Sequence, residues 1–341
     1  VVLADGDVIA LKRGRERATG RSFSLTTEGG RTIAGTLPSY TMPDVKNAAG
    51  YFVRDDMDLL DLFVGSEGTL GLVSEITLRL VAAPPVVWGV LCFLPSESAA
   101  LALVRAARAR ASGLLALEFF DGRVLDLLRR RKADASAFQE LPDLPPGAQA
   151  ALYLEVQGAT EAAVETTVLE LPGIDPEATW MGTDEREIQR LKDFRHAVPE
   201  AVNLCIDEKR KRTPGLTKLG TDLAVPNARL ADVMKLYHDG LDTSGLDYVM
   251  FGHIGNNHVH VNLLPDSLED YEKGKALYLD WAHAVVAMGG TVSAEHGIGK
   301  LKHAFLEALY GEDGIREMQA VKALFDPGRQ LNPGNLWRGD G

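Results

Sequence analysis

The apolar and polar positions of the chain alternate with two different periods, which predict strands in some stretches and helices in others. Short apolar runs at 86–94, 114–119 and 151–157 are typical of strands. A stretch of helical character follows each run, and the first of these covers 97–111. Strands and helices that alternate in this way predict an α+β fold in which an antiparallel sheet carries helices on one face.

Four more stretches have the composition and spacing of helices. They cover 184–202, 227–241, 271–288 and 307–324. Pro199 lies inside the first of them, where a proline removes one helical hydrogen bond and clashes with the preceding turn. We therefore expect this helix to kink or end close to Arg195.

The first 80 residues have the pattern of short strands separated by turns. A glycine-rich block, G-S-E-G-T-L-G at 65–71, precedes a strand expected at 72–80, and prolines follow at 84 and 85. Such a block exposes backbone N–H groups to a ligand, although it is equally compatible with a tight turn before a strand. We place a domain boundary near 83–85.

The motif F-G-H-I-G-N-N-H-V-H-V-N at 251–262 predicts a β-hairpin, because strand-like positions flank a Gly-Asn-Asn turn. Alternation with period two places His258, His260 and Asn262 on one face of the returning strand. His253 lies just before the turn on the other strand. We therefore expect His253 and His260 to converge across the hairpin.

A second motif, S-A-E-H-G-I-G-K at 293–300, supplies the carboxylate of Glu295 in a loop where backbone can approach a site closely. Two imidazoles and one carboxylate leave coordination positions open, as in a catalytic metal centre. We predict that His253, His260 and Glu295 hold a divalent cation, with zinc expected and manganese or iron as alternatives. The plainer alternative is that these are surface and cap residues that never meet. Six of the eight histidines fall between His253 and His303, which favours a site.

Length and composition are those of a globular protein of about two domains. The 341 residues are 45% hydrophobic and 25% charged, and no apolar run approaches the roughly 20 residues that span a bilayer. The net charge of −12 argues against a nucleic-acid partner. Cys92 and Cys205 lie in apolar surroundings, which predicts reduced thiols. The start of the chain lacks the features of a signal peptide, so a cytoplasmic location is expected.

Several ordered motifs resemble the FAD-linked oxidase family, the flavoproteins of the vanillyl-alcohol-oxidase type. The residues G-S-E-G-T-L-G-L-V-S-E-I-T-L-R-L at 65–80, after K-N-A-A-G-Y at 46–51, look like the end of the family's FAD-binding domain. The two histidine-containing motifs and D-P-G-R-Q-L-N-P-G-N-L at 326–336 are similar to its C-terminal domain. The resemblance is to the branch with D-lactate dehydrogenases, the flavin subunit of glycolate oxidase and D-2-hydroxyglutarate dehydrogenase.

This resemblance implies an FAD-dependent dehydrogenase that oxidises a D-2-hydroxy acid, such as lactate, glycolate or 2-hydroxyglutarate, with hydride transfer to flavin N5. The metal would bind the substrate hydroxyl and lower its pKa, and His296 would be the general base that takes the proton. The residues expected to contact the substrate are Arg195, Lys218 and Asn262. The residues expected to lie against the FAD are Glu67, Gly68, Gly71 and Asn332.

The resemblance also divides the chain into three parts. Residues 1–83 look like the C-terminal portion of a PCMH-type FAD-binding domain, 84–325 like the substrate- and metal-binding cap domain, and 326–341 like a segment that returns to the flavin. The family's glycine-rich pyrophosphate-binding loop has no counterpart before Gly65, so we expect the N-terminal part of that domain to be missing. Two alternatives therefore stay open: a truncated metal-binding substrate domain without flavin turnover, or a metal-dependent hydrolase.

One motif departs from the family pattern. Family members commonly have G-D-G-N where this chain has G-N-N-H at 255–258. His258 therefore either orients a metal ligand without binding the metal itself or changes the metal preference. The partners that the resemblance implies are a small 2-hydroxy acid and an electron acceptor, such as an iron–sulfur subunit or an electron-transfer flavoprotein. A homodimer is a further expectation.

Overall fold

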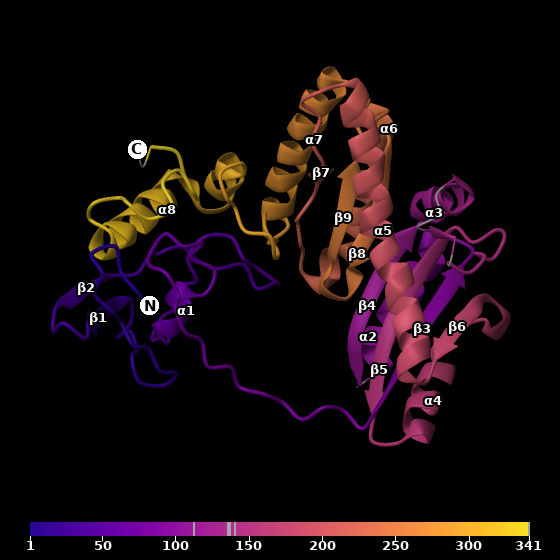
Figure 1. Ribbon diagram of the computed structural model, residues 1–341, viewed down its shortest axis with the longest axis horizontal. Coiled ribbons are helices and arrows are strands. Elements are labelled where there is room, and N and C mark those ends of the chain that lie inside the picture. Colours follow the sequence, from indigo (N-terminus) through magenta and orange to yellow (C-terminus); the bar gives the residue numbers. More distant parts are fainter. Residues whose placement is uncertain (112, 135–137, 140, 340–341) are drawn as a thin grey trace. The chain divides into compact units, whose positions relative to one another are not determined.

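The computed structural model describes residues 1–339 apart from 112, 135–137 and 140 (Figure 1). The chain forms two compact units: unit 1 comprises Val1–Leu80, Asp222–Pro226 and Leu279–Gly341, and unit 2 comprises Val81–Thr221 and Asn227–Tyr278. The division of the chain at 83 and 325 stays a prediction, and the last two residues of the C-terminal part lie outside the described residues. Residues 279–325 group with unit 1.

Unit 2 is built on an antiparallel sheet of seven strands, in the order β6-β3-β5-β4-β8-β9-β7 among the described residues. The strands are β3 (Val86–Leu94), β4 (Leu114–Asp121), β5 (Ala150–Gly158), β6 (Thr179–Gly182), β7 (Leu219–Gly220), β8 (Tyr248–His253) and β9 (His258–Leu263). The three strands predicted from apolar runs are β3, β4 and β5. The α+β class and the antiparallel sheet are confirmed.

Six longer helices accompany the sheet within the described residues. They are α2 (Glu97–Arg110), α3 (Gly122–Asp134), α4 (Glu161–Leu169), α5 (Glu185–Arg212), α6 (Leu230–Ser244) and α7 (Leu268–Ala287), the last of which ends in unit 1. Short 3-10 turns are η2 (Pro176–Ala178), η3 (Asn227–Arg229) and η4 (Ile254–Asn256). The helices predicted at 97–111, 227–241 and 271–288 correspond to α2, α6 and α7.

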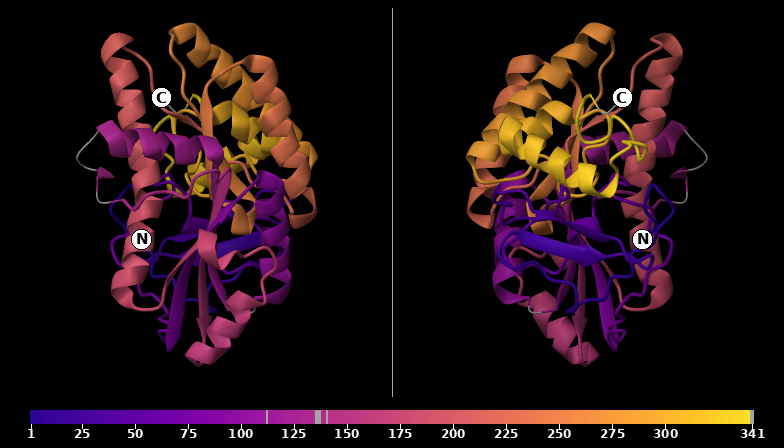
Figure 2. Two further views of the ribbon diagram at one scale, coloured as in Figure 1. Left: turned by 90° about the vertical axis from the view of Figure 1, so that its right-hand side faces the viewer. Right: turned by 90° about the vertical axis from the view of Figure 1, so that its left-hand side faces the viewer.

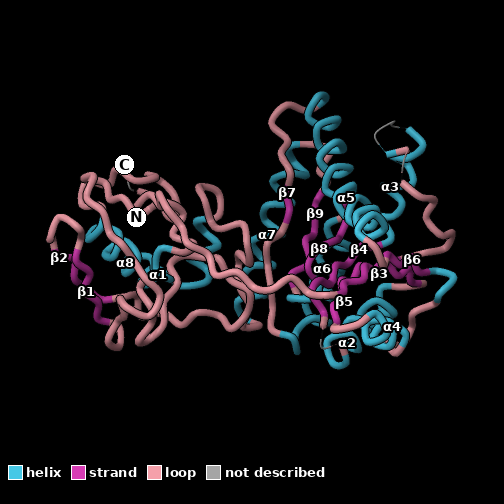
Figure 3. Tube along the Cα trace, turned by 60° about the horizontal axis from the view of Figure 1, so that its bottom comes forward, coloured by secondary structure: helices cyan, strands magenta, loops and turns pink. Residues whose placement is uncertain are grey.

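Helices lie on both faces of the sheet, whereas the sequence placed them on one. A Cβ atom on Gly89 would lie 3.1 Å from Leu191 of α5, and one on Gly158 would lie 2.7 Å from Val164 of α4. Gly158 pairs with Val86, which is an odd number of positions from Gly89, so the two glycines point to opposite faces. Figures 2 and 3 show α5 and α2 on opposite sides of the strands.

We expected the long helix α5 to kink or end near Pro199. It does not end there but continues to Arg212. Phe194, Val198 and Val202 are buried on its sheet-facing side. The ring of Phe194 lies edge-to-face with Phe93 and Phe120 of the sheet, at centroid distances of 6.2 and 5.4 Å. This continuous apolar face stabilises the helix on both sides of the one hydrogen bond that proline removes.

Unit 1 consists mostly of loops, as Figure 3 shows. Its regular elements are β1 (Ser22–Thr26), paired with β2 (Thr32–Thr36), the short α1 (Leu60–Phe63), and α8 (His303–Phe325), which is interrupted at Gly311 with φ 69°. The helix predicted at 307–324 is therefore present as α8. No helix among the described residues combines the length and the apolar composition that crossing a bilayer requires.

The strand predicted at 72–80 is wrong. Among the described residues of this stretch only Leu72 forms a bridge, with Val2, and the following residues are irregular. Ile76 is 69% exposed and Leu80 is 85% exposed. The alternating pattern alone does not make a strand, because a strand exists only through hydrogen bonds to a neighbour.

Candidate metal and substrate site

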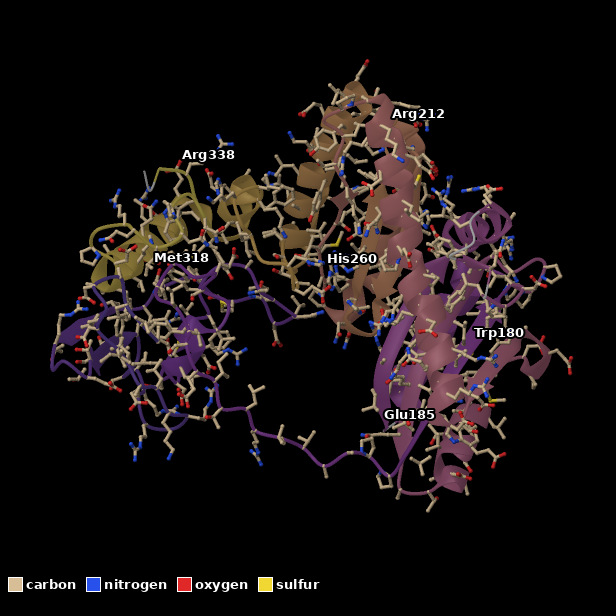
Figure 4. All side chains as sticks on the ribbon, viewed as in Figure 1. Trp180, Glu185, Arg212, His260, Met318 and Arg338 are labelled. Atoms are coloured by element: carbon tan, nitrogen blue, oxygen red, sulfur yellow. The ribbon has the colours of Figure 1, made fainter. Side chains whose placement is uncertain are left out.

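Strands β8 and β9 form the predicted hairpin and bring three imidazoles together in unit 2. His253 pairs directly with His258, and Phe251 pairs with His260. One ring nitrogen from each of His253, His258 and His260 lies within 4.8 Å of the others. Figure 4 labels His260 on β9. A cation-sized site lined by imidazole nitrogens can therefore form from a single hairpin.

The turn between the two strands is held by Arg108 of α2. Its Nη2 donates to Asn257 Oδ1 at 2.6 Å and to the carbonyl oxygen of Gly255 at 3.1 Å. The Asn257 side chain in turn donates to Asn227 Oδ1 at 2.8 Å. Asn257 has φ 54°, a conformation that asparagine tolerates well. Nothing in the sequence marked Arg108, because it is one of several arginines in its helix.

Hydrogen bonds fix the tautomers of two of the imidazoles. His253 Nδ1 lies 2.8 Å from Glu118 Oε1, and His260 Nδ1 lies 2.6 Å from the carbonyl oxygen of Thr221. A carboxylate and a carbonyl can only accept, so Nδ1 carries the hydrogen in both rings. Nε2 is then the nitrogen that would bind a metal. Histidines that bind a metal usually donate their other ring N–H to a carboxylate or a carbonyl in this way.

Glycine at position 252 makes room for one of these rings. Gly252 has φ 133°, and a Cβ atom there would lie 2.7 Å from His260 Cδ2. A side chain at this position would therefore be strained and would push the His260 ring out of place. This explains the glycine that precedes His253 in the motif.

The buried carboxylate of Glu118 also joins the hairpin to the predicted substrate ligand Arg195. Arg195 Nη2 lies 2.8 Å from the same Glu118 oxygen that pairs with His253. The Arg195 side chain remains 31% exposed, and a guanidinium has five N–H groups, so it can still receive a carboxylate from solvent. The sequence reasoning missed Glu118; its only signal is an acidic residue inside an apolar strand.

The other predicted substrate ligands of unit 2, Lys218 and Asn262, are also neighbours. Asn262 pairs with Gly220, and a Cβ atom on Gly220 would lie 3.0 Å from Asn262 Oδ1 and 3.7 Å from Lys218 Cε. Partial loss of hydration lowers the pKa of the Lys218 ammonium. The residue as a whole is nevertheless exposed to solvent. Because water still reaches the residue, we expect the ammonium to stay charged at neutral pH.

In unit 1, the loop with Glu295 and His296 is shaped by Asp222, which the sequence reasoning did not single out. Asp222 is buried and accepts hydrogen bonds from the N–H groups of Glu295 and His296, at 3.2 and 3.1 Å. It also accepts from Ser293 Oγ at 2.5 Å and pairs with Lys302 at 2.9 Å. The loop therefore has one defined backbone path.

The side chains of this loop are polar neighbours. The Glu295 carboxylate forms an ion pair with Lys46, and His296 Nε2 lies 3.4 Å from Glu295 Oε1. The His296 side chain is 63% exposed. An exposed imidazole next to a carboxylate can exchange protons with solvent and with a bound molecule.

Three of the residues predicted to lie against the FAD form a second cluster in unit 1, whereas Gly71 lies against Val1 and Val2. The Glu67 carboxylate accepts from the N–H groups of Ile298 and Gly299 at 2.7 and 2.8 Å. Asn332 donates to the carbonyl oxygen of Glu67 at 2.7 Å, and a Cβ atom on Gly68 would lie 3.9 Å from the Asn332 amide nitrogen. The Glu67 side chain thus holds the 295–299 loop, and the flavin contacts of Glu67, Gly68, Gly71 and Asn332 stay a prediction.

The fold of the chain has counterparts among solved structures. The fold is similar to that of 4-ethylphenol oxidase from Gulosibacter chungangensis, with a TM-score of 0.52 and 15% identity over 97% of this chain and 68% of the other. It is also similar to p-cresol methylhydroxylase, with a TM-score of 0.53 and 14% identity over 95% of this chain and 67% of the other. At this level of identity the similarity shows the fold alone.

The family follows from the sequence comparison. Residues 83–336 match the model of the FAD linked oxidases, C-terminal domain, and the chain belongs to this family. It is 32% identical to D-2-hydroxyglutarate dehydrogenase of Xanthomonas citri pv. viticola, over 90% of this chain and 62% of that protein. It is 29% identical to glycolate oxidase subunit GlcD of Bacillus subtilis, over 86% of this chain and 59% of that protein. The chain thus spans about three fifths of the length of these relatives.

Proposed function

We propose that the complete protein is an FAD-dependent dehydrogenase that oxidises a D-2-hydroxy acid to the corresponding 2-oxo acid. The observation that carries this proposal is the group of His253, Glu118 and Arg195 in unit 2. A 2-hydroxy acid carries its hydroxyl and its carboxylate on adjacent carbons. It therefore needs a cation for the hydroxyl close to a cationic side chain for the carboxylate, which this group can supply.

The metal ligands in this proposal are His253, His260 and Glu295. The donor set suits zinc, with manganese or iron as alternatives, and the Nδ1 hydrogen bonds of both histidines favour Nε2 as the ligand. Thr221, which accepts from His260, is followed in the chain by Asp222, which accepts from the N–H of Glu295. Glu295 as the third ligand stays a prediction. The bound cation would lower the pKa of the substrate hydroxyl.

The side chains around the substrate have separate tasks. Arg195 and Lys218 would neutralise and orient the substrate carboxylate, and Asn262 would donate its amide to a polar group of the substrate. His296 would take the hydroxyl proton, because a neutral imidazole has a ring nitrogen that can accept one. Its exposure would let it pass that proton to water.

The FAD would receive the hydride from the substrate carbon at its N5 atom. We assign its contacts in this chain to the backbone of the 65–71 loop, with Glu67, Gly68 and Gly71, and to Asn332. The Glu67 carboxylate already accepts hydrogen bonds from the N–H groups of Ile298 and Gly299. The backbone N–H groups of the 65–71 loop, and not this carboxylate, would therefore face the cofactor. Glu67 and Gly68 have positive φ angles, 54° and 70°, as in a tight turn.

The substrate class, the partners and the location are parts of the same proposal. The relatives are named for 2-hydroxyglutarate, glycolate and lactate, and each of these is a candidate substrate. An iron–sulfur subunit or an electron-transfer flavoprotein would accept the electrons, and a homodimer stays a prediction. So does the cytoplasmic location.

Flavin binding and turnover test the proposal together. The purified protein is supplied with FAD and zinc, and a panel of D-2-hydroxy acids is assayed with an artificial dye acceptor. We expect a flavin absorption spectrum, and KM for the preferred acid to rise roughly 10- to 100-fold in Arg195→Met, because charged hydrogen bonds to the carboxylate are lost. Arg190→Met, an exposed arginine of the same helix, is the control.

Several outcomes would contradict the dehydrogenase. Protein that stays colourless after FAD is added would favour the alternative of a metal-binding substrate domain without turnover. Hydrolysis of an ester or amide that depends on His253 would favour the metal-dependent hydrolase. An unchanged KM in Arg195→Met would contradict the assignment of Arg195 as the ligand of the substrate carboxylate.

A further inference from the structure

A third imidazole, His258, stands at the start of β9 directly opposite His253 in the sheet register. The sequence left open whether His258 supports a metal ligand or changes the metal preference, and the proposed ligand set does not include it. The family pattern has asparagine at this position, so a histidine here changes the donor chemistry of the hairpin. His258 has no exposed surface, which places its ring inside the folded unit.

The three rings are arranged around a common space. The ring centroids of His258 lie 4.3 Å from those of His260 and 5.5 Å from those of His253, and His253 and His260 are 5.7 Å apart. The rings are tilted by 47° to 73° to one another and do not stack. Rings tilted in this way can direct nitrogen lone pairs to one point.

The distances also suit a common ion. The ligand nitrogens lie within 4.8 Å of one another. A tetrahedral zinc ion with Zn–N bonds of 2.0–2.1 Å holds its nitrogens about 3.3 Å apart. No pair of nitrogens therefore needs to close by more than about 1.5 Å, a shift that side-chain rotations can supply.

We propose that His258 is a direct metal ligand, so that His253, His258 and His260 form a three-imidazole site that lies wholly within the β8–β9 hairpin. This rests on the proposed function, because it shares the ligands His253 and His260, and it adds His258 to the metal ligands. Three imidazoles with an open position favour zinc, cobalt or another borderline divalent ion over magnesium or calcium, which prefer oxygen.

Metal binding measured without catalysis tests this assignment. Metal-free protein is titrated with Zn²⁺ in competition with a chromogenic chelator, and with Co²⁺ while its visible absorption is recorded. We expect His258→Asn to bind Zn²⁺ at least about 10-fold more weakly than the wild type and to change the Co²⁺ spectrum. Glu295→Gln should retain the ion on its three imidazoles, and His283→Asn, an exposed histidine of α7, should match the wild type.

The outcomes separate this inference from the proposed function. If His258→Asn binds Zn²⁺ and Co²⁺ like the wild type while His253→Asn does not, the role of His258 is overturned and the proposed metal site stands. If the wild type binds neither ion, both are overturned. Should His258→Asn fail to fold by circular dichroism, the X-ray absorption spectrum of the zinc-loaded wild type decides: three imidazole scatterers support the inference, and two overturn it.

Discussion

At the scale of single residues, the buried carboxylate of Glu118 organises the candidate site. Glu118 is 5% exposed, and a buried carboxylate destabilises a protein unless it is paired. Arg195 supplies the opposite charge, and His253 gains a fixed tautomer from the same oxygen. One residue thus couples the predicted substrate ligand to a predicted metal ligand.

Replacing Glu118 with glutamine tests this coupling. The amide oxygen of glutamine carries no charge and its amide nitrogen cannot accept, so the hydrogen bonds to His253 and Arg195 weaken or are lost. We expect the Zn²⁺ affinity of Glu118→Gln to fall about 10- to 100-fold in chelator competition. Glu155→Gln on the adjacent strand β5 is the matched control, because Glu155 bonds Tyr153 Oη and Lys192. Equal affinity in Glu118→Gln and the wild type would show that Glu118 does not support the metal ligand.

A second residue-scale prediction concerns pH. A hydrogen bond that His238 donates to the Glu97 carboxylate raises the pKa of His238 above its usual value, against the opposing effect of burial. Because the folded-state pKa is raised, the stabilisation is complete below the unfolded pKa of about 6.5 and is lost as pH rises through the folded pKa. The pair is partly exposed, so its contribution is below about 1 kcal/mol.

We therefore expect His238→Gln to lower the free energy of unfolding more at pH 5.5 than at pH 8.5. Urea titration of both proteins at the two pH values measures the difference. A loss that is the same at both values, or larger at pH 8.5, would contradict an ionic contribution of His238.

At the scale of elements, a buried ion pair connects α8 to the segment after it. Lys322 pairs with Asp326 at 2.9 Å and donates to the carbonyl oxygens of Thr69 and Leu331, at 3.0 and 2.8 Å. Lys322 and Asp326 are 2% and 0% exposed. The ammonium thus ties the 65–71 loop and the 326–336 motif to one helix.

Replacing Lys322 with methionine should destabilise the protein by about 3–5 kcal/mol, because it leaves the Asp326 carboxylate buried without its cation. Lys235→Met in α6 is a matched control. Lys235 pairs with Asp239 at the same i,i+4 spacing, but the two side chains are 73% and 63% exposed, so the expected loss is below about 1 kcal/mol. Urea unfolding followed by circular dichroism measures both. Similar losses in the two variants would show that burial of the Lys322 pair has little effect.

At the scale of the whole molecule, unit 1 is assembled from three separate stretches of the chain. The middle one, Asp222–Pro226, is only a few residues long, yet its Asp222 holds the loop of Glu295 and His296. The strand expected at 72–80 fails for a related reason. Its alternating pattern is strand-like, but among the described residues only Leu72 has a strand-type partner, so the rest stays irregular.

The sequence by itself determined the helices, the central strands β3, β4 and β5, the histidine hairpin and the family. These follow from local periodicity, turn chemistry and short motifs, which neighbouring residues are enough to specify. Only the tertiary structure decided that helices cover both faces of the sheet, that α5 continues past Pro199, and that Glu118, Arg108 and Asp222 support the candidate site. The physical reason is that a buried hydrogen bond or an apolar contact depends on residues far apart in the chain, and no local pattern encodes its partner.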